Sequence, residues 1–205
     1  MNYPKLLLFF ALIGWSSFGQ AQELTERKWL VDENSSIIIN GSSNVNDFAC
    51  SMQSPPKNDT LLVNFEEKND IIKFHNTDLF IKTSCFDCQN NLITKDFQTT
   101  LQAEEHPEIL LSFVALEIPK NPKETLEQLN GEVKITIVGV SRYYRIKFDV
   151  RRNNDDYLYL AGKKEVSFND FGLTPPRKLA GFVRVNNELE IDFNLSLLPV
   201  INETF

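Results

Sequence analysis

The sequence LFIKTSCFDCQNNLITKDFQTTLQAEEHPEILLSF, residues 79–113, changes its hydrophobic periodicity twice. Residues 79–84 form a short strand-like segment, whereas residues 92–103 carry apolar side chains three and four positions apart, as a helix does. His106-Pro107 ends the helical segment, and residues 109–113 are strand-like again. Because most of the remaining chain has strand periodicity, one short helix at this place favours a β-barrel with a plug or lid.

The predicted helix, residues 92–103, is expected to lie on the barrel through one face. Asn90 or Asn91 provides the side-chain oxygen for an N-terminal cap. Phe97 and Leu101 are four residues apart and share a face, while their polar neighbours face water.

The second half of the chain alternates strictly between apolar and polar residues, as half-buried antiparallel strands do. In the last of these strands a shift by one residue would expose five large apolar side chains, so its register is fixed. Turns are predicted at residues 55–59, at 153–156 and at Asn186-Asn187, with a longer loop at 172–177. Strands are also predicted at residues 71–74 and 157–168. Eight to ten strands at this spacing, with one helix, indicate a barrel or a sandwich.

The N-terminal segment predicts export. Lys5 precedes an apolar run, residues 6–13, and Gly19-Gln20-Ala21 supplies the small residues at a signal-peptidase site, so cleavage after Ala21 is expected. The run is too short for a membrane span of about 20 residues, although a retained N-terminal anchor is the alternative. Residues 22–205 then form a single domain, periplasmic or secreted, and not an integral membrane protein.

The overall composition excludes some partners. The chain has 21 Lys and Arg against 28 Asp and Glu, for a net charge of −7, and loss of Lys5 would make it more acidic. Nucleic acid and anionic bilayers would both repel such a surface. Sixteen phenylalanines against two methionines favour a sheet-rich interior. A homodimer is left open.

The three cysteines, Cys50, Cys85 and Cys88, lie in the part of the chain predicted to be exported, where disulfides persist. They can form one bridge and leave one thiol. We favour Cys50–Cys88, which closes a long loop and would contribute about 3–4 kcal/mol. A redox pair at Cys85-x-x-Cys88 is the alternative, although the strands around it do not suggest a βαβ unit. A zinc site is disfavoured because paired ligand spacing is lacking.

The sequence contains no recognisable catalytic set. His75, in a strand tail, and His106, at a helix end, have structural interpretations as a hydrogen-bonded imidazole and a partner of the helix dipole. There is no nucleophile elbow, no glycine loop for phosphate and no His-x-x-x-His spacing. We therefore predict that the protein is not an enzyme, with no catalytic residue, no metal and no cofactor.

Several segments resemble the YceI-like family of exported bacterial proteins. The resemblance covers about Trp29 to Leu197. The segments that carry it, in family order, are WLVD (29–32), NSSI (34–37), KDF (95–97), AEEHPEI (103–109), VGVS (138–141) and SFNDFG (167–172).

The resemblance implies a mainly β fold, an antiparallel lipocalin-like β-barrel of about eight strands with one short helix. It also implies binding of a polyisoprenoid or related amphiphilic lipid. Cys50 and Cys88 resemble a cysteine pair of one branch of the family, which favours that bridge. Many relatives carry histidines near the positions of Asn34, Asn44 and Phe97, so contacts to the ligand through imidazole are not expected here.

Inward aromatic and aliphatic side chains are the candidate ligand contacts. We predict a wall with Phe97 and Leu101 near one end; its other residues are Val63, Phe74, Leu111, Phe113, Ile135, Ile137, Phe148, Phe168 and Phe193. Each buried CH₂ of a prenyl or acyl chain would contribute about 0.8 kcal/mol, so specificity would be broad.

The predicted function is periplasmic binding, transport or storage of an amphiphilic isoprenoid-type lipid, isoprenoid or acyl, without chemical change. The first alternative is a filled barrel that acts as a protein-interaction module through its acidic surface or the loop at residues 172–177. The second is thiol redox activity at Cys85 and Cys88.

Overall fold

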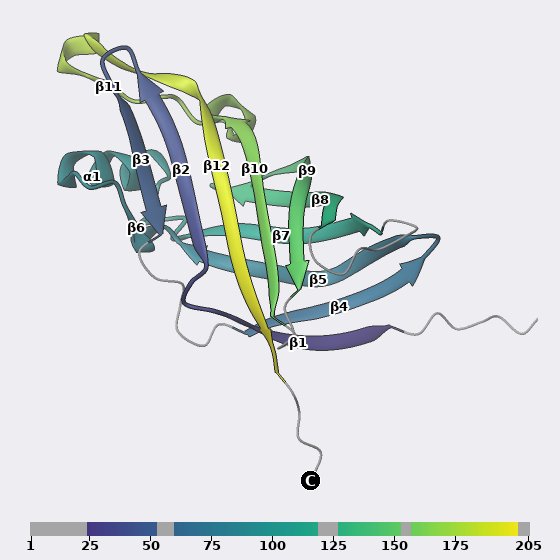
Figure 1. Ribbon diagram of the computed structural model, residues 1–205. Helices are drawn as coiled ribbons and strands as arrows, with labels where there is room; N and C mark the ends of the chain where they lie inside the picture. The colour runs from purple at the N-terminus through teal and green to yellow at the C-terminus, as the bar shows by residue number, and fades with distance from the viewer. Residues whose placement is uncertain (1–23, 53–59, 119–126, 153–156, 201–205) are drawn as a thin grey trace, which may run out of the picture.

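The computed structural model describes residues 24–52, 60–118, 127–152 and 157–200. These residues form strands and one α-helix, α1 (Asn91–Thr100) (Figure 1). The strands are β1 (Thr25–Val31), β2 (Ser36–Ser43), β3 (Asp47–Met52), β4 (Thr60–Lys68), β5 (Ile71–Lys82), β6 (Phe86–Asp87), β7 (Glu108–Glu117), β8 (Glu127–Ile137), β9 (Val140–Arg152), β10 (Leu158–Ser167), β11 (Arg177–Lys178) and β12 (Val183–Pro199).

Eight of these strands close into an antiparallel ring. Its order is β1-β4-β5-β7-β8-β9-β10-β12, and β12 closes it by pairing with β1 at Leu30 and Leu198. Closure leaves this part of the sheet without an edge strand. The predicted fold class, a mainly β antiparallel barrel of about eight strands with one short helix, is confirmed.

The sheet continues beyond the ring because β12 is 17 residues long. Its C-terminal end pairs with β1, whereas its middle pairs with β2, which continues into β3 and β6. Helix α1 lies next to this extension (Figure 1). A disulfide joins Cys50 of β3 to Cys88, just after β6, and Cys85 is a free thiol. The predicted bridge is therefore confirmed, and it ties the segment before α1 to the extension.

Helix α1 is shorter than predicted. Asn90 is the N-cap, as expected, and its Oδ1 accepts hydrogen bonds from the N–H groups of Leu92 and Ile93 at 2.9 and 3.4 Å. The helix ends at Thr100 rather than at residue 103, because Gln102 adopts a left-handed φ of 50°. Leu101 is thus the C-cap, and it is buried.

The prediction of a hairpin turn at Asn186-Asn187 is wrong. Strand β12 runs through both residues, with a register shift between Val185 and Leu189. Each amide bonds to a neighbouring strand instead of forming a turn. Asn186 Nδ2 donates to Ser42 Oγ at 2.8 Å, and Asn187 Nδ2 donates to Ser167 Oγ at 2.7 Å.

Other boundaries differ by smaller amounts. The strands predicted at residues 71–74 and 79–84 are joined in one strand, β5, which has an irregularity between Lys73 and Thr77. This strand ends at Lys82, because residues 83–85 form a 3₁₀ turn. The strand predicted at residues 157–168 is β10, Leu158–Ser167. The loop predicted at 172–177 ends earlier, since β11 begins at Arg177. The turns predicted at 55–59 and 153–156 lie outside the described residues.

Two glycines make room for the ring of Phe148. A Cβ placed on Gly131 of β8 would lie 2.7 Å from Phe148 Cε2 and 3.3 Å from the carbonyl oxygen of Ala115. A Cβ on Gly162 of β10 would lie 3.1 Å from both Phe148 Cδ1 and Ile146 Cγ2. Because Phe148 is buried, its ring cannot move away freely.

Gly131→Ala is therefore expected to lower the free energy of unfolding by about 1–3 kcal/mol through overpacking. Gly162→Ala should cost less, because its nearest contacts are looser. Urea denaturation of both variants would measure the difference. Equal stability of wild type and Gly131→Ala would show that Phe148 can relocate.

Candidate functional site

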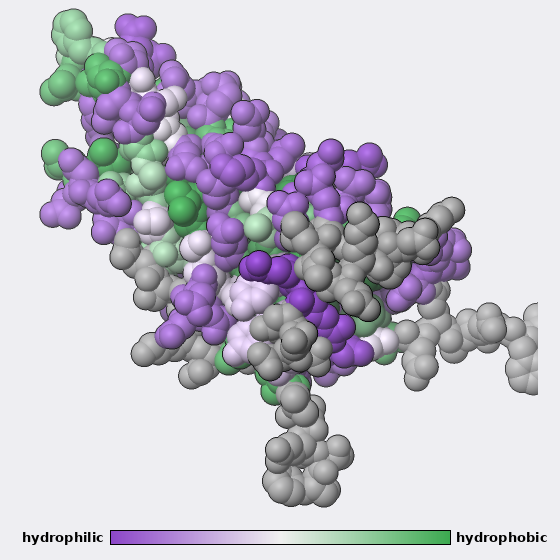
Figure 2. Space-filling model, viewed as in Figure 1, coloured by the Kyte–Doolittle hydropathy of each residue, from purple (hydrophilic) through white to green (hydrophobic). Residues whose placement is uncertain are grey.

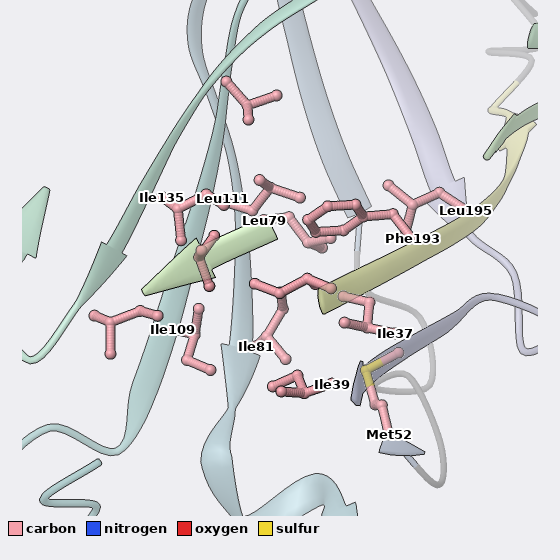
Figure 3. Packing of buried hydrophobic residues seen from close by; sticks show 14 of the residues in the cluster. Ile37, Ile39, Met52, Leu79, Ile81, Ile109, Leu111, Ile135, Phe193 and Leu195 are labelled. Atoms are coloured by element: carbon pink, nitrogen blue, oxygen red, sulfur yellow. The ribbon is translucent and has the colours of Figure 1, made fainter. Parts of the chain in front are cut away.

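A layer of apolar side chains fills the middle of the molecule. Figure 3 shows Leu111, Ile135, Phe193 and Leu195 pointing toward one another from β7, β8 and β12. Each is nearly inaccessible to solvent. The alternation predicted for the last strand is confirmed here, since Ile191, Phe193, Leu195 and Leu197 all face the interior.

One cavity lies at the end of the ring where β12 pairs with β1; we call it the ring cavity. Its volume is about 420 Å³, within the range of about 300–1,000 Å³ that is typical of ligand sites. The apolar residues that line it are Trp29, Leu61, Val63, Phe65, Ile72, Phe74, Phe113, Leu116, Val150, Leu158, Leu160 and Leu197. Phe74 and Phe113 meet edge to face, with ring centroids 6.1 Å apart.

Charged side chains are confined to the rim of the ring cavity. Arg27 of β1, Glu67 of β4 and Arg152 of β9 line it and are exposed to solvent. Thr77 contributes a buried hydroxyl whose Oγ1 lies 3.4 Å from the carbonyl oxygen of His75. The arrangement is an apolar pocket with a polar mouth, which suits an amphiphile.

A second, smaller cavity lies between α1 and the extension of the sheet; we call it the helix cavity. Its volume is about 140 Å³. Its apolar lining comes from Ile39, Phe48, Ile93, Phe97, Leu101, Phe168, Pro176, Val183, Val185 and Leu189. Phe97 of α1 also contacts Phe86, with ring centroids 5.3 Å apart.

Different parts of β12 line the two cavities. Leu197 lines the ring cavity and Leu189 lines the helix cavity. Eight residues of extended strand span roughly 27 Å. The inward residues between them, from Ile191 to Leu195, belong to the packed layer, so the two cavities are separate.

The eleven predicted contact residues therefore do not surround one space. Val63, Phe74 and Phe113 line the ring cavity, and Phe97, Leu101 and Phe168 line the helix cavity. The other five belong to the packed core between the cavities: Leu111, Ile135, Ile137, Phe148 and Phe193.

Sequence reasoning missed much of the ring cavity. Trp29 and Leu158 lie near strand ends, where alternation is short and gives little signal. Leu61 and Phe65 alternate with Val63 on β4, so period two alone could have identified them.

The SFNDFG segment, which carries part of the family resemblance, forms a 3₁₀ turn at Phe168–Phe171. The Asp170 carboxylate accepts hydrogen bonds from the backbone N–H of Ser167 and from the Tyr144 hydroxyl, both at 3.0 Å. Gly172 follows with φ 69°, which favours glycine. Burial, and then the hydrogen bond to Asp170, raise the pKa of Tyr144 well above its usual range.

This shift predicts a weakness at alkaline pH. The pKa of Tyr144 is higher in the folded than in the unfolded chain, so its stabilising contribution is complete below the unfolded value of 10.0. It is lost as the pH rises toward the folded value, because the unfolded chain releases the proton more readily. Urea denaturation at neutral pH and at about pH 11 should show a steeper loss for wild type than for Tyr144→Phe. Equal losses would contradict the assignment.

The residues described here lack the expected features of several other kinds of site. The redox pair considered at Cys85 and Cys88 is wrong, because Cys88 is bridged to Cys50. No group of three or more His, Cys, Asp or Glu side chains suited to a metal ion occurs in the described ranges. Within the same ranges, no helix has the length and apolar character to cross a membrane.

The fold matches solved structures, whereas sequence comparison finds nothing. No protein-family model matches the chain, and no curated protein does. A polyisoprenoid binding domain from Saccharophagus degradans, implicated in plant cell wall breakdown, superposes with a TM-score of 0.60 at 9% identity, over 84% of this chain and 98% of that one. BcnA of Burkholderia cenocepacia gives a TM-score of 0.58 at 16% identity, over 81% and 98%.

A mutant CJ YCEI protein matches less closely, with a TM-score of 0.46 at 16% identity over 68% of this chain and 81% of that one. At these identities the likeness to the first two structures is one of fold. It agrees with the antiparallel β-barrel with one short helix that the sequence predicts.

Proposed function

We propose that this chain, whose fold is similar to that of a polyisoprenoid binding domain, binds the apolar chain of an amphiphilic lipid in its ring cavity. The observation that carries the proposal is the cavity itself: about 420 Å³, lined by apolar side chains from seven strands of the ring, with charges at its mouth. An acyl or prenyl chain would leave water there, and a polar head group would remain near Arg27 and Arg152.

The packed layer would set the depth of the site. Above Leu197, the next inward residues of β12 are Leu195 and Phe193, and both are buried. A bound chain would end against them, so chain length rather than head-group chemistry would dominate selection. Each additional CH₂ that fits would contribute about 0.8 kcal/mol.

The proposal includes storage or transport without chemical change, in the periplasm or outside the cell. The Cys50–Cys88 disulfide supports an oxidising compartment. Lipid binding itself is supported by the fold, since one protein with a similar fold is a polyisoprenoid binding domain. The ring cavity is lined mainly by aliphatic and aromatic side chains, which suits binding rather than catalysis.

Native mass spectrometry of protein purified without detergent would test the proposal. We expect a retained hydrocarbon ligand that organic extraction removes, and uptake of farnesol or palmitate by the extracted protein. A protein that neither retains nor takes up such a ligand would contradict lipid binding.

A second candidate is favoured by the packed layer. Five of the predicted contact residues fill the core, as expected for a barrel that acts through its surface. In that case the extracted protein would show no uptake of either probe, and its stability would not change when they are added.

A further inference from the structure

Three large apolar side chains project from the end of the molecule where the β2–β3 turn meets the loop between β11 and β12. Val45, Leu179 and Phe182 are 63%, 73% and 80% exposed, and we call them the apolar tip. Figure 2 shows hydrophobic residues gathered at the end where Figure 1 places β11. Single exposed apolar residues are ordinary, but a group at one end indicates an interaction surface.

The backbone holds this tip in place. Three successive residues, 179–181, have positive φ values of 51°, 54° and 89°, which side chains other than glycine rarely adopt. Hydrogen bonds offset the cost. Asn44 Nδ2 donates to the carbonyl oxygen of Phe182 and its Oδ1 accepts from the N–H of Arg184, both at 2.8 Å. Arg184 Nε donates to the carbonyl oxygen of Gly181 at 2.9 Å. The two turns therefore form one unit.

The tip stands at the mouth of the helix cavity. Ser43 and Asn46, on either side of Val45, line that cavity. So do Lys178 and Val183, on either side of the loop that carries Leu179 and Phe182. Whatever contacts the tip is thus brought next to an apolar opening.

Two arginines lie beside the tip, although the chain as a whole is acidic. Arg177 and Arg184 are directly opposite each other in the β11–β12 pair, and both are exposed. Like charges in this position destabilise a sheet, and neither side chain forms a salt bridge with a described residue. Lys178 is neutralised by Asp96 of α1, with Nζ and Oδ1 2.6 Å apart. The two arginines lack an anionic partner within the described part of the chain.

We propose that the apolar tip docks on a lipid bilayer that contains anionic lipids. Leu179, Phe182 and Val45 enter the interface, and Arg177 and Arg184 bind head-group phosphates. Exposed charges interact over about 8 Å in physiological salt. Within the tip region the two arginines outnumber the exposed carboxylate of Asp47, two residues from Val45, while Asp96 is paired with Lys178. Docking sets the mouth of the helix cavity against the membrane. This goes beyond the lipid binding proposed for the ring cavity, since docking requires no ligand there.

Flotation with vesicles of phosphatidylglycerol and phosphatidylcholine in equal parts tests the proposal. Wild type is expected to bind these vesicles and to bind pure phosphatidylcholine more weakly. The double variant Leu179→Ser/Phe182→Ser should lose at least about tenfold in vesicle partition. Arg177→Gln/Arg184→Gln should lose about tenfold or more on the anionic vesicles, with little change on phosphatidylcholine.

Tyr143→Ser is the matched control, because Tyr143 is also an exposed aromatic, at 63%, and it lies on β9, a strand that does not line the helix cavity. It should bind as wild type does. Absence of wild-type binding, or full binding by the Leu179→Ser/Phe182→Ser variant, would overturn the proposal, as would a tip-dependent dimer in solution without vesicle binding. Farnesol uptake by the same variants, measured without vesicles, reports separately on the ring cavity.

Discussion

Replacing Cys50 and Cys88 together by alanine is expected to lower the free energy of unfolding by about 3–4 kcal/mol. The two cysteines are separated by 38 residues, so the bridge closes a long loop and removes much freedom from the unfolded chain. Both sulfur-bearing side chains are buried, so cavities at the two sites add to the cost. Urea denaturation of variant and wild type would measure it.

The structural consequence should be local to α1. The bridge fastens the segment before Asn91 to β3, and α1 has no fully buried residue within its bounds. Hydrogen exchange should therefore rise first in α1, and the helix cavity should lose its wall. Cys85→Ser is the control, since Cys85 is outside the bridge. If the double variant kept wild-type stability, the loop must be restrained by other contacts.

Val63→Glu is expected to reduce binding of a prenyl probe by at least about 100-fold, because a carboxylate in an apolar cavity costs several kcal/mol to desolvate. Val63 is buried and points into the ring cavity. Its neighbour Leu62 is on the outer face of the same strand and is 44% exposed. Leu62→Glu should change affinity by no more than about twofold. Fluorescence titration with a prenyl probe would measure both.

A third variant separates loss of binding from loss of folding. Val63→Trp puts a large indole ring into the ring cavity without adding charge, so it should weaken binding of the probe while the barrel stays folded, as near-ultraviolet circular dichroism would show. Folded Val63→Trp or Val63→Glu protein that binds like wild type would exclude the ring cavity as the site. Binding lost equally in Leu62→Glu would also count against it.

The architecture could be predicted because its signals are local and repeated. Strict alternation on β12 determines which side chains face inward, and the positions of Ile191, Phe193 and Leu195 agree with it. The N-cap at Asn90 depends only on hydrogen bonds to the nearby residues Leu92 and Ile93, so it could also be predicted. By contrast, the sequence could not show that the strand continues through Asn186 and Asn187. The partners of both amides are distant in sequence, at Ser42 and Ser167.

The candidate site was predictable in kind but not in place. The alternation of apolar and polar residues predicts that Val63 and Phe193 both face the interior, and both are buried. It does not tell how far along the barrel axis each one lies or whether a neighbour fills the space beside it. Phe148 illustrates this, because its ring occupies room left by Gly131 and Gly162 on two other strands.

The amino-acid sequence by itself determined the inward faces of the strands and the capped helix, since each follows from residue spacing along a strand or a turn. For the closed barrel and the Cys50–Cys88 pair, spacing left alternatives open, and the resemblance to a known family favoured the predictions that the structure confirms. Only the tertiary structure decided that the interior is packed at its middle and open at two ends, and that Leu179 and Phe182 stand beside Arg177 and Arg184. The physical reason is that free volume and surface charge arise from side chains far apart in sequence, whose packing no local pattern encodes.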